Sequence, residues 1–266
     1  MTVDTDSVAS PAALKYLRLQ CAHDVGPVCT RKLVEHFGSV DKVLTASIKA
    51  LEEVEGVGRY RAQAIQTARH TDAVQQAVAL AAERGARIIC REDEEYPKLL
   101  THTPDPPVCL YVRGRLEPDD GLAIAIVGSR RNTHYGIEQS ERFGALLARA
   151  GFTVVSGMAR GADGAAHRGA LSVGGRTVAV LGCGLGHVYP AEHAELAEDI
   201  VKSGALVSEL PMDVPPEAKN FPPRNRIIVG MSLGVLVTEC GKRSGAQISA
   251  RLASEYNREV FALPGL

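Results

Sequence analysis

The sequence of 266 residues predicts an α/β protein in which a doubly wound parallel sheet follows a small all-α domain. Two observations predict the sheet. From residue 122 onward, short apolar runs rich in Val, Ile and Ala alternate with amphipathic stretches, as buried parallel strands alternate with the helices that cover them. Two of these runs end in Gly with Arg two or three residues further on, which is typical of loops at the carboxyl edge of such a sheet.

The N-terminal part of the chain is expected to be helical. Residues 1–10 read as a disordered tail, and residues 11–82 alternate helical periodicity with short turns. Glycine turns at 24–27 and 54–58 each precede an amphipathic helix, and the second is similar to a helix-hairpin-helix element, in which backbone amides face a nucleic-acid phosphate. The alternative is a small helical bundle whose glycines only make turns.

Residues 83–118 are expected to form a linking layer packed on the main domain. Residues 86–90 predict a short strand, and residues 92–97 an acidic turn. The closely spaced prolines Pro104, Pro106 and Pro107 disfavour helix and predict an extended connection through residues 103–116.

Residues 119–266 are expected to form the main domain, which alternates strand and helix. The strands are expected at 123–128, 153–157, 177–182, 205–210, 234–239 and 259–264. Helices are expected between them at 136–151, 165–174, 191–204, 224–232 and 246–257. Because crossovers between parallel strands are right-handed, the loops that leave the strands should all lie on one side of the sheet.

Composition excludes several classes of protein. The formal net charge is −1, so the chain is not uniformly basic. No apolar run approaches the roughly 20 residues that a membrane helix needs, so we expect no membrane protein. The N-terminus lacks the features of a signal peptide, and six scattered cysteines form no CxxC pair. We therefore expect a cytoplasmic protein with reduced thiols, no metal site and no membrane contact.

The placement of charge is more informative than its sum. Residues 119–266 contain 15 basic and 15 acidic residues. The cations gather in or just after the predicted strand exits, whereas many of the acids fall on predicted helices. Such an edge can focus a positive potential even in a neutral domain. The alternative is a set of solvated surface arginines.

Two motifs at strand exits predict a ligand rich in phosphate. Gly128-Ser129-Arg130-Arg131 follows the first strand of the sheet, and its glycine permits a tight turn while arginine offers a planar fork for phosphate. The stretch 156–163 has Gly157 and Gly161 around Arg160. Neither motif matches the GxGxxG pattern, so no dinucleotide cofactor is indicated.

A third motif, residues 219–226, combines an aromatic residue with cations. Phe221 stands among prolines, with Lys219, Arg224 and Arg226 around it. An aromatic ring beside cations suits unpaired bases that stack while their phosphates are neutralised. The alternative is that Phe221 fills a local core beneath a loop.

The fourth motif is a strand exit followed by Lys242, Arg243, Ser244 and Gly245, which predicts a phosphate held at a helix N-terminus. Glu239, the one acid in this motif, is expected to orient Arg243 or Arg226.

Asp163 and His167 lie four residues apart on one predicted helix and could form an acid/base pair. A helix cap and a buried hydrogen bond explain both residues equally well. The sequence contains no nucleophile–base pair or metal cluster that demands catalysis, so we expect neither a cofactor nor enzymatic activity.

Together these motifs closely resemble the DprA/Smf family of DNA-processing proteins. The resemblance rests on seven motifs in family order, among them VGSRR, VSGMARGADGAAH, FPPRNRIIVGMS and RSGAQISARLA. It implies an extended Rossmann-like domain without a bound dinucleotide, preceded by a helix-hairpin-helix-like or SAM-like domain. It also implies binding of single-stranded DNA, homodimerisation, protection of incoming DNA in natural transformation, and loading of RecA recombinase.

The resemblance places DNA contacts at Arg130 and Phe221, with Arg224 and Arg226 as neighbours. Asn220 and Pro223 depart from the usual histidine and arginine of that motif, which removes one local cation. The full expected DNA-binding set is Gly128, Ser129, Arg130, Arg131, Gly157, Arg160, Gly161, Lys219, Phe221, Arg224, Asn225, Arg226, Lys242, Arg243, Ser244 and Gly245.

Two rival classes of protein remain. A nucleotide phosphoribohydrolase on the same fold would need a PGGxGT loop, which this sequence lacks. A module that binds only proteins is the other alternative. The chain stops at Leu266, whereas many family members continue into a small winged-helix-like domain, so we expect no such domain here. A homodimer is expected through the α/β domain, because the last strand has an edge to cover and no following helix.

Overall fold

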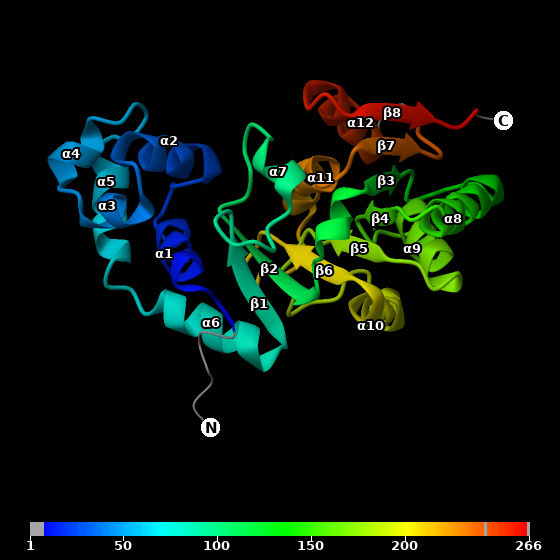
Figure 1. Ribbon diagram of the computed structural model, residues 1–266, viewed down its shortest axis with the longest axis horizontal. Coiled ribbons are helices and arrows are strands. Elements are labelled where there is room, and N and C mark those ends of the chain that lie inside the picture. The colour runs from blue at the N-terminus through cyan, green and yellow to red at the C-terminus, as the bar shows by residue number, and fades with distance from the viewer. Residues whose placement is uncertain (1–7, 242–243, 265–266) are drawn as a thin grey trace. The chain divides into compact units, whose positions relative to one another are not determined.

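The computed structural model describes residues 8–241 and 244–264 (Figure 1). The chain divides into two compact units. The first contains the residues up to 96 together with 104–110, and the second contains residues 97–103 with those from 111 onward. The stretch 83–118, expected as one linking layer, is therefore shared between the two units.

The first unit is mainly helical. Its elements are α1 (Pro11–Gln20), α2 (Pro27–Phe37), α3 (Val40–Thr45), α4 (Ile48–Glu52), α5 (Arg59–Ala68), α6 (Ala73–Glu83) and β1 (Ala86–Cys90). Ser10, Ser39 and Ser47 cap three of these helices by accepting a hydrogen bond from an amide three residues further on. The expected glycine turns end at Gly26 and Gly58, which stand at the N-caps of α2 and α5.

The start of the chain differs from the expected disordered tail at residues 8–10. Val8 and Ala9 are buried, and Ala9 forms a parallel bridge with Ile88 of β1. Ser10 caps α1. Val8 and Ala9 bury their side chains and pair with the free edge of β1. The free energy gained by this burial outweighs the preference of the polar residues before them for a disordered chain.

The second unit is the α/β domain. It contains α7 (Lys98–Thr101), η2 (Pro118–Gly121), β3 (Ala123–Val127), α8 (His134–Arg149), β4 (Thr153–Ser156), α9 (Ala162–Ser172), β5 (Thr177–Val180), η3 (Ala191–His193), α10 (Ala194–Ser203), β6 (Ala205–Ser208), η4 (Ala218–Asn220), α11 (Phe221–Gly230), β7 (Gly234–Val237), α12 (Gly245–Glu255) and β8 (Glu259–Ala262). β2 (Cys109–Gly114) starts in the first unit and continues into the second.

The sheet of the α/β domain is mostly parallel. From β2 its strand order is β2-β6-β5-β4-β3-β7-β8, with β2 antiparallel to β6 and the other pairs parallel. The six strands predicted from apolar runs are β3 to β8, and all six form, so the predicted fold class is confirmed.

The order of the strands locates a crevice. After β3 the chain winds through β4, β5 and β6 on one side, and β7 and β8 then continue the sheet on the other side of β3. α8 packs beside α9, and α9 beside α10, whereas α11 packs against α12 (Figure 1). The direction of winding therefore reverses between β3 and β7, where doubly wound folds bind ligands.

The core of this domain lies between the central strands and the helices. Ile126 of β3, Val154 of β4 and Leu236 of β7 are buried together with Ala166 and Ala170 of α9. Small residues on the helix let it approach the strands closely, and this packing fixes the ends of β3, β4 and β7 relative to one another.

Candidate nucleic-acid interface

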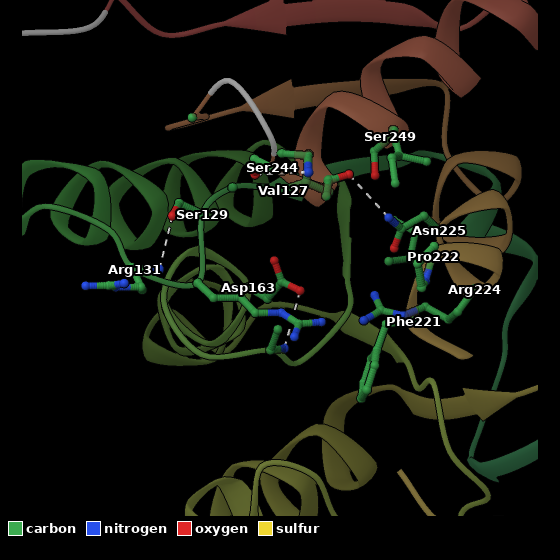
Figure 2. Close-up of a pocket in the computed structure, with 18 residues that line it drawn as sticks. Val127, Ser129, Arg131, Asp163, Phe221, Pro222, Arg224, Asn225, Ser244 and Ser249 are labelled. Atoms are coloured by element: carbon green, nitrogen blue, oxygen red, sulfur yellow. Dashed lines mark hydrogen bonds between the residues drawn. The ribbon is translucent and has the colours of Figure 1, made fainter. Parts of the chain in front are cut away.

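A pocket with a volume of about 470 Å³ opens where β3 and β7 end. Figure 2 shows its walls, which come from the loop after β3, the start of α9, the start of α11 and the start of α12. Nine of the expected DNA-binding residues line it: Gly128, Ser129, Arg130, Arg131, Phe221, Arg224, Asn225, Ser244 and Gly245.

The loop after β3 is fixed by its own backbone and by two neighbours. The amide of Ser129 donates to the carbonyl oxygen of Glu239 at 2.8 Å, and the Ser129 Oγ accepts from the amide of Arg131 at 3.0 Å. Gly161 backs the loop with φ +78°, and a Cβ there would lie 2.5 Å from the Ser129 carbonyl oxygen. Only glycine combines this conformation with so close an approach.

Arg130 is exposed and stacks on Phe221. Its Cζ lies 4.8 Å from the centre of the Phe221 ring, within the range of a cation–π contact. The ring also lies against Gly182 and is tilted by 44° to the ring of Tyr189, with 5.4 Å between the ring centres. Phe221 is thus a half-buried ring held on three sides rather than a free platform.

The helix expected at 224–232 begins three residues earlier, so residues 221–223 belong to α11 and not to a loop. Phe221, Pro222 and Pro223 are the first three residues of α11, after the N-cap Asn220. Proline is tolerated in the first turn of a helix because the amides there have no intrahelical partner.

Arg224 is buried, with 6% of its surface exposed. Its guanidinium covers Gly157, where there is no room for a Cβ, and this contact explains the glycine. Burial lowers the pKa of Arg224, while the nearby Asp163 acts in the opposite direction. Figure 2 shows Arg224 reaching from α11 toward Asp163. Arg224 therefore forms the floor of the pocket and not a solvated contact on its edge.

Asp163 and His167 serve the fold. The Asp163 Oδ2 accepts from the amide of Ala159 at 3.3 Å, and burial raises the pKa of its carboxyl. The Nδ1 of His167 forms a hydrogen bond with the hydroxyl of Thr177 at 2.7 Å, and burial lowers the pKa of His167 to about 3. Hydrogen bonds within the fold thus account for both residues, and the acid/base interpretation is wrong. The cap expected at Asp163 is also wrong, because Gly161 is the N-cap of α9 and Asp163 lies in its first turn.

Three expected cations are paired with acids outside the pocket. The Nη2 of Arg160 lies 3.0 Å from Glu192, the Nζ of Lys219 2.6 Å from Glu217, and the Nη2 of Arg226 2.6 Å from Glu209. Gly157 and Gly161 lie behind the pocket wall, against Arg224 and the Ser129–Arg130 backbone. Fewer cations are therefore available to a ligand at this edge of the sheet than the number of basic residues in the sequence suggests.

Glu239 does not orient Arg226. Its carboxylate accepts hydrogen bonds from the amide and hydroxyl of Thr133, the N-cap of α8, at 3.0 Å and 2.7 Å. Glu239 thus ties the end of β7 to the loop after β3. Arg243, the other suggested partner, and Lys242 lie outside the described residues.

The start of α12 forms another wall of the pocket. The Ser244 Oγ accepts from the amide of Ala246 at 3.3 Å, and the Gly245 carbonyl accepts from the Asn225 side chain at 3.3 Å. α12 is eleven residues long, so its N-terminus carries the partial positive charge of a helix end.

Tyr189 was not singled out as a contact residue from the sequence. It lies between Phe221 and Arg160, whose Cζ is 6.0 Å from the centre of the Tyr189 ring. The available signal was the GHVYPAEH stretch, in which an aromatic residue and an acid follow the exit of β5.

Within residues 8–241 and 244–264, no group of three or more His, Cys, Asp or Glu side chains is placed to hold a metal ion. In the same part of the chain, every helix is too short or too polar to cross a lipid bilayer.

Comparison with known proteins identifies two sequence families. Residues 87–266 match the family described as DNA recombination-mediator protein A, and residues 22–78 match the helix-hairpin-helix motif. The second match confirms the predicted helix-hairpin-helix element. Because the first family is one of recombination mediators, the expectation that the chain is not an enzyme is confirmed at the level of the family.

Among curated relatives, Protein Smf of Synechocystis is 40% identical over 90% of this chain, and Protein Smf of Escherichia coli is 50% identical over 67%. DNA processing protein DprA of Bacillus subtilis is 39% identical over 69%. The chain spans 61%, 48% and 62% of these relatives' own lengths.

Two solved structures share the fold. DNA processing protein A from Streptococcus pneumoniae superposes with a TM-score of 0.81 at 30% identity, over 96% of this chain and 87% of that one. DNA processing protein A from Helicobacter pylori, described with a single-stranded DNA binding mode, gives 0.60 at 32% identity, over 65% and 80%. By sequence and by fold, this chain belongs to the DNA recombination-mediator protein A family, the DprA/Smf family of DNA-processing proteins.

Proposed function

We propose that this chain binds single-stranded DNA in the pocket at the ends of β3 and β7. The stacked pair Arg130 and Phe221 carries the proposal. An arginine neutralises a phosphate and presents a flat face to a base, and an aromatic ring stabilises that stack. A single strand, with phosphates and unpaired bases exposed together, can use both contacts.

The charges around the pocket favour an anionic ligand. Among the described lining residues, Arg130, Arg131 and Arg224 are basic and Asp163 is acidic, which leaves an excess of two positive charges. The N-terminus of α12 adds its partial positive charge. The exposed positions of Arg130 and Arg131 suit backbone phosphates, and buried Arg224 supports the pocket from below.

The pocket favours an unpaired strand over a duplex. Its volume of about 470 Å³ suits a nucleotide that is free to leave a base stack. A base pair holds both of its bases in the duplex, and extraction of one of them costs free energy.

The proposal is tested by titrating fluorescent oligonucleotides, single-stranded and duplex, across a salt series. We expect tighter binding of single strands and a fall in log K of about 0.7 per unit of log salt for each phosphate neutralised. Equal affinity for duplex, or an affinity independent of salt, would contradict the proposal.

We further propose that the bound strand is protected and passed to RecA recombinase during DNA uptake. The description of the family as a recombination mediator supports this role, as does the single-stranded DNA named for the Helicobacter pylori relative. The measurements are nuclease resistance of the bound strand and the rate of RecA filament formation with and without this protein. No change in either would contradict it.

A homodimer through β8 is the assembly we propose. β8 is the edge strand next to β7, and its residues Glu259–Ala262 are exposed. Val260 and Phe261 are 41% and 50% exposed. An exposed apolar edge strand invites pairing with a second copy, and two DNA sites in one particle would raise the avidity for a long strand.

A further inference from the structure

A row of four side chains leads from the pocket across the surface of the α/β domain. Arg130 stacks on Phe221, the Phe221 ring centre lies 5.4 Å from that of Tyr189, and the Arg160 Cζ lies 6.0 Å from the Tyr189 ring centre. The row therefore alternates cation, ring, ring and cation. Arg130 and Phe221 line the pocket, whereas Tyr189 and Arg160 lie beyond its lining.

The two outer members come from different loops. Arg160 lies between β4 and α9, and Tyr189 lies between β5 and η3. One hydrogen bond joins the two segments: the Nδ1 of buried His193, the last residue of η3, lies 2.9 Å from the carbonyl oxygen of Met158, two residues before Arg160. The spacing of Arg160 and Tyr189 is thus set by the fold and is preorganised for a ligand.

We propose that Tyr189 and Arg160 form a second nucleotide subsite, which takes the base and phosphate next to those in the pocket. The inference rests on the proposed function, since it extends the same strand by one step. A second ring gives the next base a stacking partner, and a second exposed arginine gives its phosphate a counter-charge.

Glu192 is the competitor for this subsite. Its two carboxylate oxygens bind the Nε and Nη2 of Arg160 in a bidentate pair, the geometry in which a guanidinium also binds phosphate. Both side chains are about half exposed, and exposed ion pairs contribute little to stability. A phosphate can therefore displace Glu192, and in the absence of DNA the carboxylate keeps Arg160 in its binding position.

The experiment measures the affinity of thymidine mononucleotide, of the dinucleotide and of oligothymidines up to about 16 nucleotides long for the full chain and its variants. We expect Tyr189→Ala to bind the mononucleotide, which occupies the pocket alone, as the unmodified chain does. For strands of two or more nucleotides it should lose affinity by about 5- to 150-fold, the range for loss of one stacked base. Tyr189→Phe should retain most of the affinity, because the ring makes the contact. Arg160→Ala should reduce the salt slope by about 0.7.

Glu192→Gln should raise the affinity for long strands several-fold, because the competing charge is removed. The chain offers a matched control pair, Arg113 and Glu198, a bidentate pair with both contacts at 2.8 Å on the same domain but away from the row. Arg113→Ala and Glu198→Gln should leave both affinity and salt slope unchanged. Thermal unfolding of each variant separates misfolding from loss of contact.

The outcomes separate the subsite from the proposed function. If the unmodified chain binds no single-stranded DNA, the proposed function fails. If it binds, but Tyr189→Ala loses the same factor for the mononucleotide as for longer strands, Tyr189 only supports Phe221 and the second subsite is wrong. It is equally wrong if Glu192→Gln behaves like Glu198→Gln. Should Tyr189→Ala fail to fold, the Glu192 and Arg160 comparisons decide the question.

Discussion

Arg130 and Phe221, which belong to different elements, form one stacked unit with 4.8 Å between the guanidinium carbon and the ring centre. Neither side chain is therefore an independent ligand contact. A base can reach the unit by stacking on the outer face of the guanidinium, or by taking its place above the ring. In the first route the ring supports the guanidinium, and in the second the base must displace the guanidinium from the ring. Both routes involve both side chains, so the effects of substitutions at the two residues on binding should be coupled.

Phe221→Ala should weaken binding of single-stranded DNA by about 1–3 kcal/mol if the stack carries a base. Phe221→Tyr keeps the ring and should bind as the unmodified chain does. Binding is measured by fluorescence anisotropy, with thermal unfolding in parallel. Loss of stability without loss of affinity would make Phe221 a plug of the local core instead.

Arg130→Ala should weaken binding by a similar factor for every sequence, because phosphate contacts carry no base information. Its salt slope should fall by about 0.7. Arg130→Lys keeps the charge but loses the planar face, so its affinity for DNA should lie between that of the unmodified chain and that of Arg130→Ala. Arg142→Ala, an exposed arginine of α8 outside the pocket lining, is the matched control. An equal loss in Arg142→Ala would point to overall charge rather than a site.

Arg224→Ala should mainly destabilise the fold, by about 1–3 kcal/mol, because it removes a buried side chain that covers Gly157 and a cation that favours the charged form of Asp163. Adding Asp163→Asn to the same chain should restore part of the loss. Urea denaturation measures both effects as shifts of the midpoint at constant slope. A normal midpoint combined with weak DNA binding would instead assign Arg224 to direct contact with the strand.

Stability should fall on acidification below pH 6.5 because of His167. Its pKa is about 3 in the folded chain against 6.5 ordinarily, so between these values the unfolded chain binds the extra proton. The free energy of unfolding should then fall by about 1.4 kcal/mol per pH unit from this group. His167→Asn should show a shallower fall in the same window when unfolding is measured across pH. An unchanged slope would mean that His167 is charged in the folded state.

Phe261→Lys combined with Val260→Lys should convert a dimer into a monomer, because a charged edge resists strand pairing. Light scattering at several concentrations measures the mass. Leu146→Lys, at an apolar position of α8 with 46% exposure, is the matched control and should leave the mass unchanged. An unmodified chain that is monomeric at high concentration would contradict the dimer and leave the DNA site untouched.

The strands of the α/β domain could be predicted from the sequence because burial on both faces demands continuous apolar runs. β3 to β7 follow that pattern, and β8 carries a similar apolar run although its residues are exposed. The glycine turns before α2 and α5 follow from the chemistry of helix starts. The start of α11 could not be predicted from the sequence. Two consecutive prolines indicate a break in a helix unless the helix is known to begin there.

The site was only partly predictable for a different reason. A linear pattern treats every arginine as solvated, yet Arg224 is enclosed by Gly157 and Asp163, and Arg226 is paired with Glu209. Such partners come from other strand exits, so only the folded chain reveals them. Arg130 was easier to place, because it directly follows a strand at the reversal of winding.

The pocket walls come from segments as far apart in the chain as Ser129 and Ser244, at the two strands that meet where the winding reverses. No short piece of the chain can reproduce them, and the unfolded chain has no such site. A ligand held there is therefore released when the domain unfolds. Bound oligonucleotide should raise the melting temperature in proportion to the logarithm of its concentration, which makes DNA itself a stabiliser of the domain that carries it.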